Sequence, residues 1–190
     1  SVAHGATTTF TVTPNSGYLP SVGGTCGGTL SGTTYTTNAI TASCTVVASF
    51  AQMTGTLTSS SPSCTIPAGS SSCTVNLTWS TTNPIATSAV TASGMADVNG
   101  NSGGPQAFTA PYSSRTFYLY NNMIEIASKT ITSSCVIGYH FDGSVCIEDN
   151  NNPNAPTIEA VDTKFYKNYN LRFKFSGTDP DVSDTISYGV

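Results

Sequence analysis

The sequence predicts an all-β protein built from small β-sandwich units in tandem, each stapled by a disulfide bond. Ser and Thr account for 57 of the 190 residues (26 Ser and 31 Thr), and the β-branched side chain of Thr suits a pleated strand. Gly, Pro and Asn interrupt the chain at short intervals, and apolar residues nowhere repeat with helical spacing. Six cysteines, an even number, occur as three successive neighbours.

Residues 1–52 form the first expected unit. Phe10 and Val12 alternate with threonines, residues 14–17 (PNSG) read as a turn, and residues 44–50 read as a strand. The segments FTVTPNSGY and YTTNAITASCTVVASF resemble the InlB B-type repeat of large bacterial surface proteins and lipoproteins. Members of that family usually begin with about two more strands, so the resemblance implies that front strands are missing from this unit.

Residues 53–132 form the second expected unit, a β-sandwich. Val75, Leu77 and Trp79 fall on one face of an alternating strand, together with Cys73, and are the expected core anchors. The stretch SCTIPAGSSSCTVNLTWSTTNP resembles Ig-like modules of bacterial cell-surface proteins, in which a short disulfide joins adjoining strands. Further along, the Asn-Gly pair at 99–100 predicts a hairpin turn.

The remaining chain divides into a linker and a partial third unit. Residues 133–156 are similar to a short Cys-loop followed by a Pro/Asn linker, and the Cys-loop is too small to form a hydrophobic core of its own. Residues 157–190, with GTDPDVSDTISYGV, resemble part of a cadherin-like or PKD-like repeat. They predict about three strands, fewer than the seven of a sandwich.

The cysteines favour disulfides over a metal site. Six cysteines allow 15 connectivities, so the sequence does not fix the pairing. Local pairing is the economical interpretation, because each pair would close one strand-turn-strand unit: Cys26–Cys44, Cys64–Cys73 and Cys135–Cys146. A zinc site would need paired CxxC motifs or nearby His. Disulfides predict an oxidising compartment, with the chain extracellular or on the cell surface.

Charge is confined to one part of the chain. All 16 charged side chains lie between Asp97 and Asp184, and residues 1–96 carry none. Six cations against ten anions argue against nucleic-acid binding, which needs clustered Lys and Arg. The sequence also has no apolar run long enough to span a membrane, and any signal peptide is expected to have been removed or to lie outside it.

Enzyme signals are weak, and the chain is expected not to be an enzyme. The histidines are His4 and His140, and a Ser-His-Asp triad would have to use His140 with the nearby Asp142. His140 lies inside the 135–146 Cys-loop, which leaves little room for a substrate cleft. The nucleophile-elbow, zincin and P-loop motifs are all absent.

Calcium is the one cofactor that the sequence suggests. Asp179, Asp181 and Asp184 share one short segment, and Asp149 in the linker could complete an oxygen-ligand set like that of cadherin-like repeats. The segment does not match an EF-hand, because the turn Gly and the final Glu are missing. A solvated acidic turn is the alternative interpretation.

Two surface features bear on glycans. Exposed tyrosines beside polar groups are typical of carbohydrate binding, although tyrosines at the rim of a sandwich core would give the same pattern. The candidates are Tyr112, Tyr118, Tyr120, Tyr166 and Tyr169. Asn76 begins the single sequon Asn-Leu-Thr and is a candidate glycosylation site.

Together these features predict a structural subunit or stalk segment of an extracellular bacterial surface fibre. The incomplete units leave two explanations: an excerpt of a longer protein, or completion by strands exchanged between copies. The expected partners are therefore other copies of the chain or neighbouring domains of a longer chain. The alternative function is an adhesin or carbohydrate-binding module with glycan partners.

Overall fold

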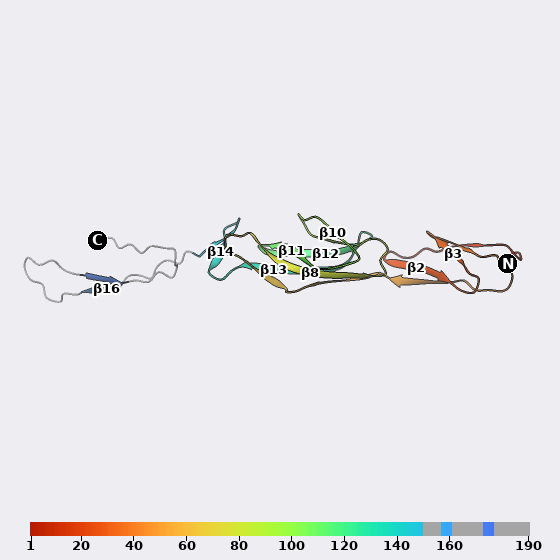
Figure 1. The fold of residues 1–190 in the computed structure, drawn as a ribbon, viewed down its shortest axis with the longest axis horizontal. Coiled ribbons are helices and arrows are strands. Elements are labelled where there is room, and N and C mark those ends of the chain that lie inside the picture. Colours follow the sequence, from red (N-terminus) through yellow and green to blue (C-terminus); the bar gives the residue numbers. More distant parts are fainter. Residues whose placement is uncertain (150–156, 161–172, 177–190) are drawn as a thin grey trace, which may run out of the picture. The chain divides into compact units, whose positions relative to one another are not determined.

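The computed structural model describes residues 1–149, 157–160 and 173–176 (Figure 1). Every regular element within these ranges is a β-strand, so the predicted all-β class is confirmed. The chain divides into two compact units. The first contains residues 1–66 and 72–134, and the second contains residues 67–71 and 135–190.

The first 52 residues form two small sheets rather than one. A three-stranded antiparallel sheet has the order β1-β4-β3, and a two-stranded ribbon pairs β2 with β5. The bounds of these strands are β1 (Thr9–Thr11), β2 (Tyr18–Gly23), β3 (Gly28–Ser31), β4 (Thr34–Thr37) and β5 (Val47–Gln52). The predicted turn at residues 14–17 is present, where the Tyr18 amide donates to the Asn15 carbonyl at 3.1 Å.

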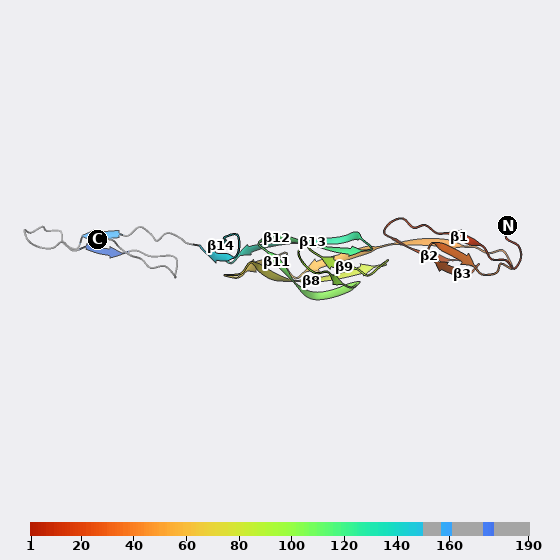
Figure 2. The same cartoon turned by 90° about the horizontal axis from the view of Figure 1, so that it is seen from above.

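Eight further strands form a β-sandwich, as predicted (Figure 2). One sheet has the order β11-β8-β6, and the other has the order β10-β9-β12-β13-β7. The bounds in the first sheet are β6 (Thr54–Ser59), β8 (Ser72–Thr82) and β11 (Ser102–Pro111). Those in the second are β7 (Ser63–Ile66), β9 (Ala89–Thr91), β10 (Val98–Asn99), β12 (Ser113–Asn121) and β13 (Ile124–Cys135).

The sandwich core follows from strict alternation along β8. Val75, Leu77 and Trp79 are at most 4% exposed, while the residues between them face solvent. The Trp79 indole packs edge-on against Phe108 of β11, which in turn meets Phe117 of β12 in the opposite sheet at 5.4 Å between ring centres. These aromatic contacts join the two sheets.

The Asn-Gly turn predicted at residues 99–100 is not a hairpin. It connects β10 in the five-stranded sheet to β11 in the three-stranded sheet, so the two strands do not pair. The Gly100 carbonyl instead accepts a hydrogen bond from Trp79 Nε1 at 2.9 Å. The predicted turn is therefore present, but it connects the two layers of the sandwich and is bonded to the tryptophan of β8.

A buried asparagine holds the loop before β9. Asn121 is 1% exposed, and its Oδ1 accepts hydrogen bonds from the backbone amides of Ile85 and Ala86, both at 3.0 Å. Its Nδ2 donates to Ser88 Oγ and to the Ala86 carbonyl. Because every polar atom of the side chain has a hydrogen-bond partner, burying this amide costs little free energy, and its hydrogen bonds hold the loop in place.

The second unit contains two short hairpins. One is β14 (Tyr139–Phe141) with β15 (Cys146–Glu148), and the other is β16 (Thr157–Ala160) with β17 (Phe173–Ser176). The Cys146 amide donates to Ser70 O at 2.9 Å, and the Gly69 amide donates to Cys146 O at 2.8 Å. The Cys-loop is therefore held by backbone hydrogen bonds to residues 67–71 as well as by its disulfide.

Replacing Leu77 by Ala is expected to destabilise the sandwich by about 2–5 kcal/mol, because a fully buried leucine leaves a cavity that the core cannot refill. Thr74→Val, on the exposed face of the same strand, is the control and should change stability by less than about 0.5 kcal/mol. Urea unfolding followed by tryptophan fluorescence measures both. Equal stability of the two variants would contradict the assignment of this face to the core.

Candidate interaction surface along strand β5

Strand β5 exposes every one of its side chains. All six residues from Val47 to Gln52 are exposed, although four of them are apolar: Val47, Ala48, Phe50 and Ala51. Val47 is 59% exposed and Phe50 is 45% exposed, and Leu19 on the paired strand β2 is 37% exposed. We call the outer edge of β5 together with these three apolar side chains the β5 surface.

One edge of β5 has no strand beside it among the described strands. β5 pairs with β2 from Val47↔Gly23 to Gln52↔Tyr18, and the two make a separate two-stranded sheet. The Gln52 carbonyl accepts a hydrogen bond from Asn83 Nδ2 at 2.9 Å, so one end of the strand is capped by a side chain. An unpaired edge presents backbone donors and acceptors that another strand can use.

Covalent and hydroxyl contacts fix the register of the ribbon. The Cys26–Cys44 disulfide lies beyond the β2 end and before the β5 start, with a Cα–Cα distance of 4.9 Å. Beside it, the Thr45 amide donates to Thr25 Oγ1 at 2.9 Å. Gly24 has φ of 111°, and a Cβ there would lie 2.2 Å from the Thr45 carbonyl oxygen, so this close approach requires glycine.

The core beneath this part of the chain is small. Before residue 53, the buried side chains are Val12, Tyr35 and Thr37. Phe10 lies opposite Tyr35 in the β1–β4 ladder, yet it is 46% exposed. A hollow of about 650 Å³ lies beside it, next to the Cys26–Cys44 disulfide. The first 52 residues therefore leave much of their own apolar surface in contact with solvent.

The three disulfides join Cys26 to Cys44, Cys64 to Cys73 and Cys135 to Cys146, which is the local pairing that the sequence favoured. No free cysteine occurs in the chain, since these bonds use all six. Three disulfides indicate an oxidising environment.

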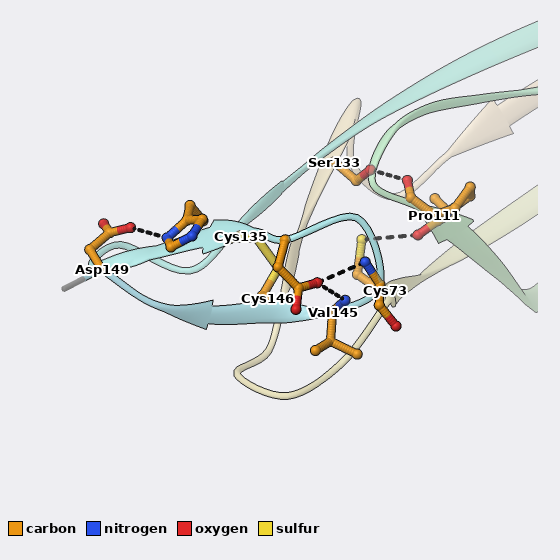
Figure 3. The surroundings of a disulfide bond; sticks show 11 residues. Cys73, Pro111, Ser133, Cys135, Val145, Cys146 and Asp149 are labelled. Carbon is orange, nitrogen blue, oxygen red and sulfur yellow. Dashed lines mark hydrogen bonds and ion pairs between the residues drawn. A yellow bond between two sulfur atoms is a disulfide. The ribbon is translucent and has the colours of Figure 1, made fainter. Parts of the chain in front are cut away.

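The Cys-loop does not assemble the triad considered from sequence (Figure 3). His140 Nδ1 lies 2.8 Å from Asp149 Oδ1, and both side chains are more than a third exposed. Asp142 instead turns back onto its own loop, where its Oδ1 accepts hydrogen bonds from the amides of Ser144 at 2.7 Å and Val145 at 2.8 Å. The expected neighbour of His140 is therefore replaced by a carboxylate nine residues away, and Asp142 serves as a turn cap.

Of the four proposed calcium ligands, the structure describes Asp149. Its carboxylate is hydrogen-bonded to His140. Within residues 1–149, and in the two short strands described after them, no group of three or more His, Cys, Asp or Glu side chains gathers as a metal site would need. Asp179, Asp181 and Asp184 lie outside the described residues.

The candidate glycan residues are spread over several elements. Tyr118 and Tyr120 share the solvent face of β12, and Tyr112 is 43% exposed at the β11–β12 connection. Tyr166 and Tyr169 lie outside the described residues. Asn76 is exposed on β8, on the face opposite to Trp79.

The pKa of the Asp142 carboxyl is held below its ordinary value of 3.8, first by the hydrogen bonds from Val145 and Ser144 and also by the nearby His140. A lowered folded-state pKa means that the stabilisation is present above pH 3.8 and is lost as the pH falls through the lower value. We expect the amide resonances of Ser144 and Val145 to titrate with a midpoint below 3.8. Asp142→Asn keeps an acceptor oxygen and should remove the titration. A midpoint above 3.8 would contradict this arrangement.

Comparison with protein-family models, with curated proteins and with solved structures finds no match. Among the residues that the structure describes, none forms a helix that could cross a membrane. The function must therefore be inferred from the geometry of the chain itself, and the most unusual geometry is the uncovered β5 surface.

Proposed function

We propose that this chain is a structural segment of an extracellular bacterial surface fibre or stalk, and that copies join by adding a strand to β5. The observation that carries the proposal is the six-residue strand whose side chains are all exposed and whose outer edge pairs with none of the described strands. A two-stranded ribbon is marginally stable by itself, and a third strand would supply both backbone hydrogen bonds and cover.

The energetic gain from covering the β5 surface is substantial. Leu19, Val47 and Phe50 are each roughly half exposed. By strand alternation Val47 and Leu19 lie on one face of the ribbon and Phe50 on the other, so a strand added at the edge would cover part of each side chain and not all of it. Full burial of such a side chain contributes about 1.5–3 kcal/mol, so partial cover would contribute roughly 1–2 kcal/mol in total. This gain adds to that of the new backbone hydrogen bonds, which favours addition of a strand over simple surface contact.

The edge also lacks the devices that usually prevent strand addition. Natural edge strands are protected by charges, prolines, bulges or shortness. β10 has two residues, and β11 contains Pro105 and an irregular register between Gly103 and Gln106. β5 is longer than β10, carries no Pro and no charge, and belongs to a stretch of 96 uncharged residues. Two copies can therefore approach along this edge without repulsion between like charges.

A fibre requires that the donated strand come from a different part of the neighbouring copy. Pairing of β5 with β5 about a two-fold axis would close as a dimer, whereas a head-to-tail contact repeats without limit. The β16–β17 ribbon, which also has two strands among those described, is one available donor. The resemblance of residues 1–52 to the InlB B-type repeat, and of 53–132 to Ig-like modules, supports the same surface role.

The proposal treats the chain as non-catalytic and extracellular. His140 is paired with Asp149 on an exposed loop rather than with Asp142 beside a nucleophile. The three disulfides support an oxidising location outside the cytoplasm. Hydroxyl pairs such as Thr116 with Thr130, 2.8 Å apart on neighbouring strands, give an uncharged surface whose contacts change little with salt.

Substituting Ser49 by Lys is expected to weaken association between copies by about tenfold or more, because a charge on the edge must be desolvated when another strand pairs with it. The wild-type chain should form particles whose mass increases with concentration, and negative-stain micrographs should show filaments. Sedimentation velocity over a range of concentrations measures the effect.

Thr74→Lys is the matched control, since it adds the same charge to the exposed face of β8, away from β5. It should associate like the wild type. A wild-type chain that stays monomeric, or that stops at a dimer, would contradict a fibre built through β5.

A further inference from the structure

The outer face of the five-stranded sheet carries a pair of tyrosine rings. Phe117 and Leu119 of β12 are fully buried, so the alternating Tyr118 and Tyr120 lie on the outer face of the sheet, where they are half-buried. Their ring centres are 6.1 Å apart and the planes are tilted by 38°. Across the ladders, Tyr118 lies opposite Thr91 of β9 and Ser128 of β13. Tyr120 lies opposite Ala89 of β9 and Glu125 of β13. The cross-strand neighbours of the two rings are therefore small or polar side chains.

A hollow of about 390 Å³ lies at the Tyr120 end of this pair. Ligand pockets are typically about 300–1,000 Å³, so the volume suits a small polar ligand. The side chains that line it combine hydroxyls, one carboxylate, one amide, one methyl and one thioether with the tyrosine ring: Thr87, Ala89, Thr91, Asp97, Tyr120, Asn122 and Met123.

The rim of the hollow is a strained turn. Asn122 and Met123 connect β12 to β13 with φ of 49° and 64°, the left-handed values of a two-residue hairpin turn. Such turns favour Gly at the second position, and a bulky side chain there is costly. Met123 is nevertheless 93% exposed, so no packing against the protein compensates for this conformation. Strain that the fold does not need is typical of a functional position.

We propose that this face binds a neutral carbohydrate, with one sugar ring stacked on Tyr120 and its hydroxyls bonded to Asp97, Asn122 and Thr91. An aromatic ring presents an apolar face to the C–H side of a sugar, while the surrounding donors and acceptors bind its hydroxyls. Met123 then covers the edge of the ring.

Charge selects the class of ligand. No Lys or Arg lines the hollow, and the neighbouring acidic groups are Asp97 and Glu125, the latter opposite Tyr120 in the ladder. An anionic ligand is therefore disfavoured. A quaternary ammonium ligand would be enclosed by several aromatic faces, whereas Tyr120 is the single ring that lines this hollow. A flat, hydroxyl-rich ligand fits an open ring with polar neighbours better.

This inference goes beyond the fibre proposal and does not depend on it. The residues of the hollow lie on β9, β12 and their adjoining loops, and the β5 surface contributes none of them. A chain that fails to assemble could still bind sugar, and a chain that assembles could fail to bind.

The test is NMR titration of the purified chain with neutral hexasaccharides of glucose, mannose, xylose and N-acetylglucosamine, and in parallel with choline chloride. At least one hexasaccharide should shift the Met123 methyl and the Thr91 amide, while choline should not. Shifts with choline alone would overturn the proposal in favour of an ammonium site. The absence of shifts with all four sugars would also overturn it.

Variants separate binding from folding. Tyr120→Ala and Asp97→Asn should each weaken binding of the responding sugar at least several-fold, and Tyr112→Ala, an exposed tyrosine outside the hollow, should not. Met123→Gly should weaken binding while raising Tm, because glycine relieves the left-handed backbone. Unchanged affinity in Tyr120→Ala and Met123→Gly, with both folded by circular dichroism, would contradict the site.

Discussion

Apolar side chains are sparse in this chain. The stability of each group of strands therefore depends on how many of these side chains the group can bury. In the sandwich, alternate side chains of β8 and of β12 face the core, and Leu77 and Leu119 are both 0% exposed. Eight strands share that core. Before residue 53 only five strands are available, in two separate sheets, and Phe10, Val47 and Phe50 stay roughly half exposed.

Disulfides compensate where packing is insufficient, and they do so locally. Each links cysteines between 9 and 18 residues apart, so each constrains one small segment of chain. By a chain-entropy estimate, loops of this length stabilise by about 3 kcal/mol each. That contribution holds the ribbon and the Cys-loop together, but it covers no apolar surface. We propose that another strand supplies cover for the β5 surface, and this proposal links the fold to the assembly.

The sequence predicted the features that depend on short-range pattern. The alternation from Cys73 to Trp79 predicted β8 and its buried face, and the neighbouring cysteines favoured the observed disulfides. Features that depend on distant segments could not be predicted in this way. Asn121 binds a loop some 35 residues away, and the Asn-Gly turn joins two sheets and accepts a hydrogen bond from the distant Trp79. The exposure of β5 could not be predicted either, because the sequence pattern of an apolar strand is the same whether or not another strand covers it.

The most direct test of the account is hydrogen–deuterium exchange in residues 47–52, measured across a range of protein concentrations. Addition of a strand protects backbone amides on the open edge, whereas the amides of β8 are protected inside the sandwich at every concentration. We expect exchange in 47–52 to slow as the protein concentration rises, while exchange in 72–82 does not change. Exchange in 47–52 that is independent of concentration would contradict the claim that another copy completes this sheet.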